Sequence, residues 1–129
     1  MEIISLSLDK NTLKELDKAQ QQLGFKSRSK MFRAALNALL DEYKAIGSLE
    51  GKHEVIFIIT YKESEKNHVS NILHEFKNAI PTTMHQHRAR LGLDILDVYA
   101  DAGTIRSLFS ALKRSKCINS MNFTLLTQE

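Results

Sequence analysis

Ile3-Ile4-Ser5-Leu6-Ser7-Leu8-Asp9 is the stretch that decides how the first part of the chain folds. Apolar and polar residues alternate along it, which is the pattern of a β-strand that buries one face and exposes the other. An isolated strand cannot satisfy its backbone hydrogen bonds, and residues 10–46 offer no second strand. The sequence therefore predicts that this strand pairs, antiparallel, with the same strand of a second copy of the chain.

The two faces of the predicted ribbon differ in chemistry. The apolar face would lie on the helices, and the outward face carries Ile3, Ser5 and Ser7. A two-stranded ribbon is one way to read the major groove of DNA. The serine hydroxyls can bond to base edges, whereas Ile3 can make only apolar contacts, for instance with a thymine methyl. We therefore predict that these three residues bind DNA.

Two helical patterns follow the strand, with a glycine between them. Asp9 is the expected N-cap of a helix over residues 10–23, and Gly24 suits the left-handed position that ends a helix. Ser27 or Ser29 is the expected cap of the second helix. The apolar residues of that helix are Met31, Phe32, Ala35, Leu36, Leu39, Leu40 and Tyr43. This face is wide for one helix, which is consistent with burial against a second chain.

The start of the second helix is a candidate phosphate site. The first amides of a helix have no partner within the helix and carry a partial positive charge. Arg28, Ser29 and Lys30 lie beside these amides. We predict that the three residues contact the DNA backbone. The alternative is ordinary capping with solvated charges.

The first third of the chain resembles the ribbon-helix-helix family of DNA-binding proteins. The residues that carry the resemblance, between position 3 and about position 43, are Leu6-Ser7-Leu8-Asp9, Leu13, Leu16, Gly24-Phe25 and Ser27-Arg28-Ser29. The resemblance implies a β-α-α domain that forms an intertwined homodimer and binds double-stranded DNA. We place this domain at residues 1–46.

A second domain is predicted at residues 53–129, after a glycine-containing linker at residues 47–52. Its expected elements are a central strand at 55–61, a helix from 64 that Pro81 closes, strands at 82–90 and 93–100 with Gly92 marking the turn between them, a helix from 101 or 104, and a strand at 118–127. The order β-α-β-β-α-β predicts an α+β, ferredoxin-like or ACT-like domain, with an antiparallel sheet and both helices on one side.

His85-Gln86-His87 is the pattern in this domain that favours a metal site. On a strand, residues two apart project from the same face, so both imidazoles can reach one ion. His74 lies near the end of the preceding helix and outside the apolar face of that helix. Surface histidines without a ligand are the alternative interpretation.

With H-x-H on its second strand, the two-domain chain resembles the nickel-responsive regulator (NikR) family over nearly its whole length. The resemblance implies a square-planar site between regulatory domains of a homotetramer, with His85 and His87 from one chain and His74 from another. It also implies a cysteine on the following strand, where this sequence has Gly92, or Leu93 in an ungapped count. Neither can bind a metal. The three histidines would therefore suit zinc, cobalt, copper or octahedral nickel about equally well.

Composition limits the other function classes. The net charge of +3 permits binding to nucleic acid without requiring it. The sequence has no apolar run long enough to span a membrane, no signal-peptide pattern at its start and one cysteine, Cys117, which together predict a cytoplasmic protein. It also has no phosphate loop, no nucleophile–base pair and no carboxylate pair placed for acid–base chemistry, so we do not expect an enzyme.

These patterns together predict a sequence-specific transcriptional regulator. It would be a repressor that responds to a ligand or transition metal, and it would bind its operator as a dimer or tetramer. The alternative is a ribbon-helix-helix protein whose second domain serves only oligomerisation or the binding of a small molecule, without metal sensing.

Overall fold

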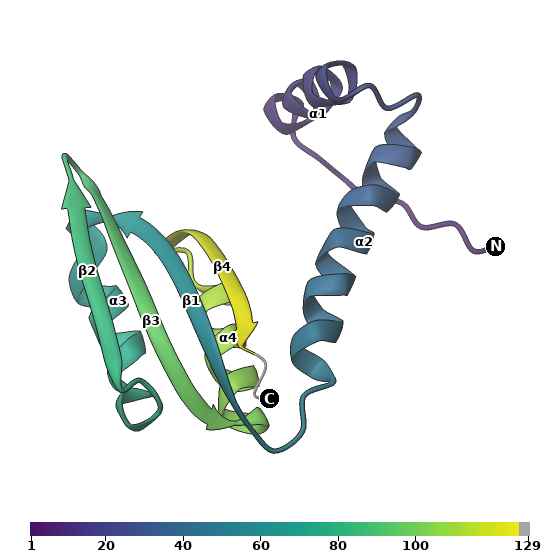
Figure 1. The fold of residues 1–129 in the computed structure, drawn as a ribbon. Helices are drawn as coiled ribbons and strands as arrows, with labels where there is room; N and C mark the ends of the chain where they lie inside the picture. The colour runs from purple at the N-terminus through teal and green to yellow at the C-terminus, as the bar shows by residue number, and fades with distance from the viewer. Residues whose placement is uncertain (127–129) are drawn as a thin grey trace. The chain divides into compact units, whose positions relative to one another are not determined.

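The computed structural model describes residues 1–126 and divides the chain into two compact units, Met1–Lys44 and Ala45–Glu129 (Figure 1). Helix α2 (Arg28–Gly47) ends, and strand β1 (Lys52–Lys62) begins, on either side of residues 48–51. The glycine-containing segment between these elements is therefore four residues long. The domain boundaries expected from the sequence stay predictions.

The first unit contains helix α1 (Lys10–Leu23), and its two ends follow from local chemistry. The Asp9 carboxylate accepts a hydrogen bond from the amide of Thr12 at 2.7 Å, so it satisfies one of the free amides of the first turn. Gly24 ends the helix in the left-handed region, with φ at 77°. Both of these predictions are confirmed.

Helix α2 begins one residue after its cap. The Ser27 hydroxyl accepts a hydrogen bond from the amide of Lys30 at 3.1 Å, so Ser27 rather than Ser29 is the capping residue. The helix then continues through Ile46, which is 1% exposed and belongs to the core of the second unit.

Residues 1–9 have no regular secondary structure in the single chain. The strand that the alternating pattern predicts is therefore not formed by one chain alone. The physical reason is that a strand needs a second strand to bond with, and within residues 1–44 the structure contains only helices besides loops. Pairing with a second copy stays a prediction.

The apolar side chains of the first unit are largely exposed. They include Ile4, Leu6, Leu8, Phe32, Leu36, Leu39, Leu40 and Tyr43, which are between 38% and 88% exposed. Met31 is the one buried apolar residue of this unit among those described. A soluble chain rarely leaves a face of this size uncovered, so the face has the character of an interface.

The second unit is a four-stranded antiparallel sheet with its helices on one face (Figure 1). Its elements after β1 are the short turn η1 (Glu63–Glu65), α3 (Lys66–His74), η2 (Lys77–Ala79), β2 (Thr82–Arg88), β3 (Leu91–Asp101), α4 (Ala102–Arg114) and β4 (Ile118–Leu126). The predicted β-α-β-β-α-β order is confirmed, up to Leu126; Thr127, where the last strand was expected to end, lies outside the described residues. No helix among the described residues is both long and apolar enough to cross a membrane.

The core lies between the sheet and its helices. Strand order β2-β3-β1-β4 makes β1 a central strand, as its apolar run predicts. Alternate residues of β1 and β3 point into the core, which contains Val55, Phe57, Ile59, Leu96, Val98, Ile105, Leu108 and Leu112, all at most 1% exposed. Burial of this apolar surface is the main stabilising contribution to the unit.

Gly92 does not mark the turn between β2 and β3, and that prediction is wrong. The turn consists of Ala89 and Arg90, and Ala89 adopts a positive φ of 52°. Gly92 lies within β3, between His87 on β2 and Tyr61 on β1. A glycine within a strand is typical of a place where another group approaches the backbone closely.

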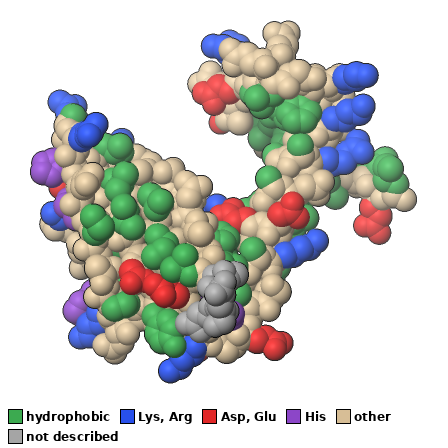
Figure 2. Space-filling model, in the orientation of Figure 1, with side chains coloured by type: hydrophobic (Ala, Val, Ile, Leu, Met, Phe, Trp, Pro, Cys, Tyr) green, Lys and Arg blue, Asp and Glu red, His purple; other side chains and the backbone are tan. Residues whose placement is uncertain are grey.

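The face of the sheet opposite the helices is open (Figure 2). Its exposed apolar side chains include Ile58, Met84, Leu91 and Tyr99, which are between 40% and 54% exposed. Two carboxyl groups, Glu54 and Asp97, lie on the same face. Oδ1 of Asp97 is buried without a hydrogen-bond partner among the described residues.

Glu54→Gln is expected to stabilise the protein at neutral pH. Hydrogen bonding and charge repulsion from Asp97 raise the pKa of Glu54 above its ordinary value. A carboxyl group whose pKa folding raises contributes stability at acid pH, and this contribution is lost as the pH rises through the folded pKa. The amide does not ionise, so the thermal unfolding midpoint of the variant should exceed that of the wild type at pH 7. The difference should disappear below a pH of about 4. A wild type that is the more stable protein at pH 7 would contradict this account.

Candidate functional site

The predicted base-reading residues are accessible in the single chain. Ile3, Ser5 and Ser7 are all exposed, and Ile3 is 91% exposed. Their place on a paired ribbon is a prediction from the sequence alternation alone.

Arg28 forms an ion pair at the start of α2. Its Nε and Nη2 atoms donate to the two carboxylate oxygens of Asp17 at 2.8 and 2.9 Å. The hydrogen bonds and opposite charges lower the pKa of Asp17 and raise that of Arg28. This bidentate pair joins α1 to α2, so Arg28 has a structural role that the sequence alone did not indicate.

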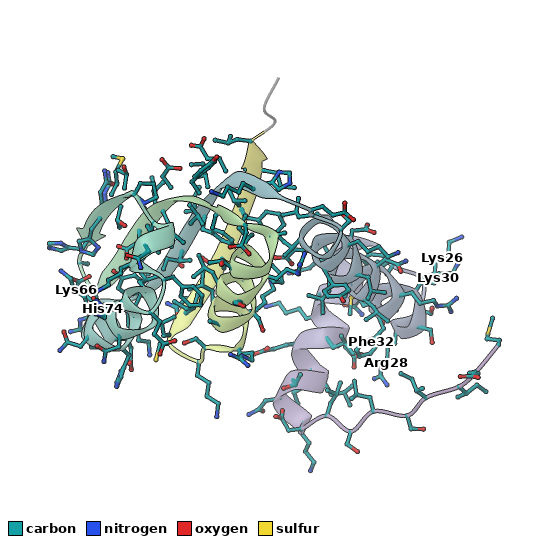
Figure 3. The ribbon with its side chains drawn as sticks, turned by 90° about the horizontal axis from the view of Figure 1, so that it is seen from below. Lys26, Arg28, Lys30, Phe32, Lys66 and His74 are labelled. Atoms are coloured by element: carbon teal, nitrogen blue, oxygen red, sulfur yellow. The ribbon has the colours of Figure 1, made fainter. Side chains whose placement is uncertain are left out.

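The other cations near this helix start are exposed (Figure 3). Lys30 follows Ser29, and Lys26 precedes the cap Ser27. Neither lysine forms an ion pair that the structure records among residues 1–126, in contrast to Arg28. Lys30 is therefore the better candidate of the predicted phosphate-binding cations, and Lys26 is a residue that sequence reasoning did not select.

His85 and His87 lie on the same face of β2, as their spacing predicts. The register places His85 opposite Asp94 and His87 opposite Gly92 on β3. Because paired residues of an antiparallel sheet share a face, both histidines lie on the side that the helices cover. Their ring centroids are 6.1 Å apart. Tyr61 on β1 stands opposite Gly92 and completes this group.

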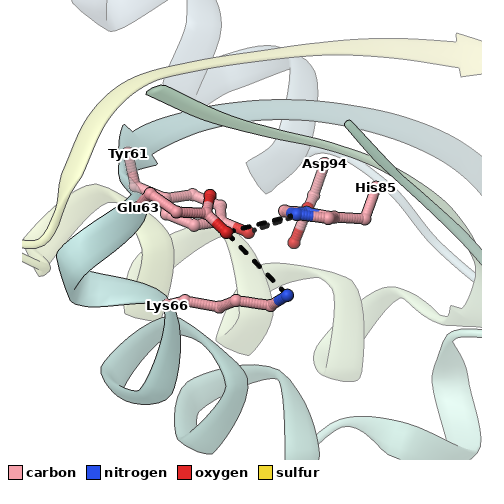
Figure 4. A network of polar contacts seen from close by, with 5 residues as sticks. All are labelled: Tyr61, Glu63, Lys66, His85 and Asp94. Carbon is pink, nitrogen blue, oxygen red and sulfur yellow. Dashed lines mark hydrogen bonds and ion pairs between the residues drawn. The ribbon is translucent and has the colours of Figure 1, made fainter. Parts of the chain in front are cut away.

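Asp94 anchors His85. Nδ1 of His85 lies 2.5 Å from Oδ1 of Asp94, and the hydroxyl of Tyr61 donates to the same oxygen at 2.9 Å (Figure 4). Asp94 is 5% exposed, and a buried carboxylate needs such donors. Burial and the bond to Asp94 raise the pKa of Tyr61 well above its usual range, so the phenol keeps its proton and donates it. With Nδ1 bound to Asp94, Nε2 is the nitrogen of His85 left for another partner.

Glu63 lies on the Nε2 side of His85. Its Oε1 is 3.7 Å from Nε2 of His85 and 3.9 Å from Nζ of Lys66 (Figure 4). Its Oε2 is buried and has no hydrogen-bond partner among the described residues. A buried carboxylate oxygen without a partner is rare in folded proteins and calls for an explanation.

Gly92 makes room for two of these side chains. A Cβ at this position would lie 2.6 Å from Cε2 of Tyr61 and 2.8 Å from Oε2 of Glu63. Both distances are below 3.0 Å, a separation from other heavy atoms that real Cβ atoms essentially never show. The tyrosine ring and the Glu63 carboxylate therefore occupy the place that a side chain at position 92 would take.

His74 faces the same pocket as His85. This pocket, of about 390 Å³, is also lined by Lys66, Ser70, Thr83 and Asp94. His74 itself is exposed, near the end of α3. Within one chain it is not grouped with the other histidines at metal-ligand distance. A role in metal binding would therefore involve His74 of a second copy, as the sequence resemblance implies.

The donors present do not fit a square-planar nickel–thiolate centre. Position 92 has no side chain, position 93 is leucine, and Cys117 lies near Glu65 rather than near the histidine pair. Imidazole and carboxylate donors are instead what zinc, cobalt and octahedral nickel accept. The local chemistry therefore fits a divalent transition metal, but not the thiolate form of the site.

Sequence reasoning missed Tyr61, Glu63 and Asp94. The sequence predicted both Tyr61 and Asp94 only as strand residues. One signal was present for Asp94: it shares the inward period of β3 with Leu96 and Val98, where a charged residue is unusual. No local signal connected Glu63 with the histidines, because His85 and Gly92 lie on β2 and β3.

Comparisons with known proteins match the start of the chain to one family and give relatives over nearly its whole length. Residues 2–43 match the family described as “Ribbon-helix-helix protein, copG family”. A Methanococcus maripaludis protein named “Putative nickel-responsive regulator” is 30% identical over 98% of this chain and 92% of its own length. A similarly named protein of Methanothermobacter thermautotrophicus is 29% identical over 98% of this chain and 93% of its own length.

A solved structure supports the fold. An uncharacterized protein from Thermotoga maritima aligns with a TM-score of 0.53 and 21% identity. The alignment covers 59% of this chain and 99% of that protein. At this identity the likeness concerns the fold alone, over the three fifths of the chain that the alignment covers.

Proposed function

The chain belongs to the nickel-responsive regulator family, and from this premise we propose that it is a sequence-specific DNA-binding transcriptional regulator that responds to a divalent transition metal. It binds its operator through the paired ribbon of a dimer, and it represses transcription. The observation that carries the proposal is the match of residues 2–43 to the ribbon-helix-helix family, joined in one chain to a unit with the His85 and His87 pair. The relatives are named as regulators, in agreement with the prediction that the chain is not an enzyme.

The exposed apolar face of the first unit supports dimerisation. Leu6 is 68% and Leu36 is 52% exposed in the single chain. In a two-chain ribbon these side chains would be buried, at roughly 25 cal/mol for each Å² of apolar surface covered. The second copy that covers them also supplies the strand that residues 3–9 need.

The DNA contacts divide into two kinds. Ile3, Ser5 and Ser7 lie on the outward face of the ribbon and contact base edges in the major groove. Ser29 and Lys30, at the start of α2, contact DNA phosphates. Arg28 bonds to Asp17 on α1, and its remaining N–H donors reach the DNA backbone.

The metal is held in the second unit. His85 and His87 bind it from one chain, and His74 of a second copy completes the site, which makes a homotetramer the assembly that senses metal. The open sheet face with Ile58, Met84 and Tyr99 is available for contacts between second units. Such a regulator would work in the cytoplasm.

Ser5→Ala with Ser7→Ala tests the base-reading role. We expect the double variant to bind DNA of its own promoter at least about 10-fold more weakly, since the dimer loses the hydroxyls of both serines from both chains and each hydrogen bond contributes about 0.5–1.5 kcal/mol. Binding to unrelated DNA should stay as strong and as salt-dependent as in the wild type, because phosphate contacts are unchanged. Fluorescence anisotropy on both DNAs measures this, with Ser110→Ala on α4 as the matched control.

An equal loss on both DNAs would contradict base reading by these serines. Wild-type protein that does not distinguish its own promoter from unrelated DNA would favour the second candidate, a ribbon-helix-helix protein whose second unit only mediates assembly. Metal analysis of the purified protein separates the same two candidates, with His85→Ala/His87→Ala as the comparison.

A further inference from the structure

We propose that Glu63 is a metal ligand and takes the place of the missing cysteine. With Nε2 of His85 and an imidazole nitrogen of His87, its carboxylate forms a two-histidine, one-carboxylate site within a single chain. The inference deepens the proposed metal response and rests on it. It changes the donor set, and therefore the class of metal that the protein senses.

The three groups already lie close together. One ligand atom from each of Glu63, His85 and His87 lies within 4.8 Å of the other two. An ion bound at about 2.0–2.2 Å from each donor would place those donors about 3–3.5 Å apart. The Glu63 Oε1 to His85 Nε2 distance of 3.7 Å is near this range. Small side-chain movements would therefore complete the site.

The orientation of His85 is the one that a metal ligand needs. Ligating histidines almost always donate their other ring N–H to a carboxylate or carbonyl. Here Nδ1 of His85 contacts Asp94, which in turn accepts a hydrogen bond from Tyr61. This arrangement fixes the ring and directs the Nε2 lone pair toward Glu63.

The buried oxygen of Glu63 gives independent support. Oε2 has no hydrogen-bond partner among the described residues, and a buried acceptor left without one costs about 1–3 kcal/mol. A cation coordinated by the carboxylate would remove this cost. Nζ of Lys66 lies 3.9 Å from the other oxygen, Oε1, so it balances part of the carboxylate charge without bonding to Oε2.

Gly92 leaves the room that the Glu63 carboxylate occupies. A Cβ there would lie 2.8 Å from Oε2 of Glu63 and 2.6 Å from the Tyr61 ring. A side chain at position 92 and a Glu63 carboxylate at this place exclude each other. The glycine is therefore part of the carboxylate site rather than a simple loss of the thiolate.

The donor set indicates the metal class. A thiolate favours soft or square-planar ions, whereas two imidazoles and a carboxylate with open positions suit zinc, cobalt and iron(II). His74 of a second copy can fill one of the open positions. We therefore expect this donor set to bind zinc or cobalt.

A second cluster, Glu65, His68 and Cys117, has similarly close ligand atoms. Its groups already satisfy one another, since Glu65 bonds to His68 at 2.6 Å and accepts from Sγ of Cys117 at 3.4 Å. Burial and the adjacent Glu65 raise the pKa of Cys117, which keeps the thiol protonated. This cluster therefore serves as the internal competitor in the test.

The test is a titration of the full chain with zinc by calorimetry and with cobalt by absorption, without DNA. Wild type should bind at micromolar concentration, and Glu63→Gln should bind at least about 10-fold more weakly, since even indirect partners of a metal ligand cost that much. Glu65→Gln, two residues along, should bind as the wild type does. Lys66→Gln should bind more tightly because it removes the competing cation, a gain that a damaged fold would not produce.

The outcomes are distinct. The proposal would be overturned if Glu63→Gln bound metal as tightly as the wild type. A loss of metal affinity in Glu65→Gln alone, or a cobalt–thiolate absorption band, would also overturn it. A wild type that binds neither zinc nor cobalt at micromolar concentration would also overturn it. Glu63-dependent metal binding without specific DNA binding would instead contradict the proposed regulator function and leave the metal site standing.

Discussion

Replacing Gly92 with alanine is expected to lower the free energy of unfolding of the second unit by about 1–3 kcal/mol. The added Cβ would meet Cε2 of Tyr61 at 2.6 Å and Oε2 of Glu63 at 2.8 Å. Glu63 can move toward solvent, but Tyr61 is 1% exposed and packed in the core, so it cannot turn away cheaply. Chemical denaturation monitored by circular dichroism measures the change.

Gly103→Ala is the matched control for this prediction. Gly103 lies in the first turn of α4, and a Cβ there would meet only Oδ2 of Asp101, at 3.1 Å. This atom accepts the capping hydrogen bond from the amide of Thr104 at 3.2 Å, so the added Cβ costs a small shift of the cap. The higher helix propensity of alanine offsets that cost, so the variant should be close to neutral. If Gly92→Ala were as stable as Gly103→Ala, the close approach of Tyr61 and Glu63 to position 92 would be wrong.

Replacing Leu6 with glutamate is expected to abolish pairing of the first units. In the dimer each chain would bury this side chain, which is 68% exposed in the single chain. Losing two buried leucines costs about 3 kcal/mol or more, and the charge adds a desolvation penalty. The pairing should therefore weaken at least about 100-fold. Operator binding should be lost with it, because half a ribbon cannot fill the groove.

Ile3→Glu separates assembly from DNA contact. Position 3 lies on the outward face of the predicted ribbon, where a carboxylate does not enter the dimer core. We expect this variant to keep the mass of the wild type in sedimentation equilibrium and to lose DNA affinity through repulsion by the phosphates. If Leu6→Glu and Ile3→Glu behaved alike in sedimentation, the assignment of the two faces would fail.

Local signals predicted the first helix well. Asp9 and Gly24 act on backbone groups a few residues away, so their positions in the sequence determine where α1 begins and ends. The same holds for Ser27 at the start of α2. The central strand was predictable because an uninterrupted apolar run over residues 55–61 suits a strand covered on both sides.

The site depends on contacts that sequence distance hides. Gly92 was interpreted as a turn because glycine is common in turns, and nothing near it shows that Tyr61 approaches from another strand. Arg28 was assigned to DNA, but its partner Asp17 lies on α1. The position of Gly92 opposite Tyr61 depends on strand register, and the Arg28–Asp17 pair depends on how α1 packs on α2. Periodicity alone determines neither.

Metal and DNA are coupled in the proposed regulator by mass action. A metal that binds one assembly better than another shifts the population toward the assembly that it prefers, here the form that binds the operator. The size of the shift is limited by the difference between the affinities of the metal for the two assemblies. Glu63→Gln should therefore reduce the metal dependence of operator binding while leaving the metal-free affinity unchanged.

In the proposed function, two copies of this chain read DNA through a paired ribbon. A nuclease footprint of the wild-type protein on the promoter of its own gene, with zinc or cobalt present, tests it most directly. We predict protection with two-fold symmetry at protein concentrations that leave unrelated DNA of the same length unprotected, because two identical ribbons read related half-sites. Equal protection of both DNAs, or protection without symmetry, would contradict the claim.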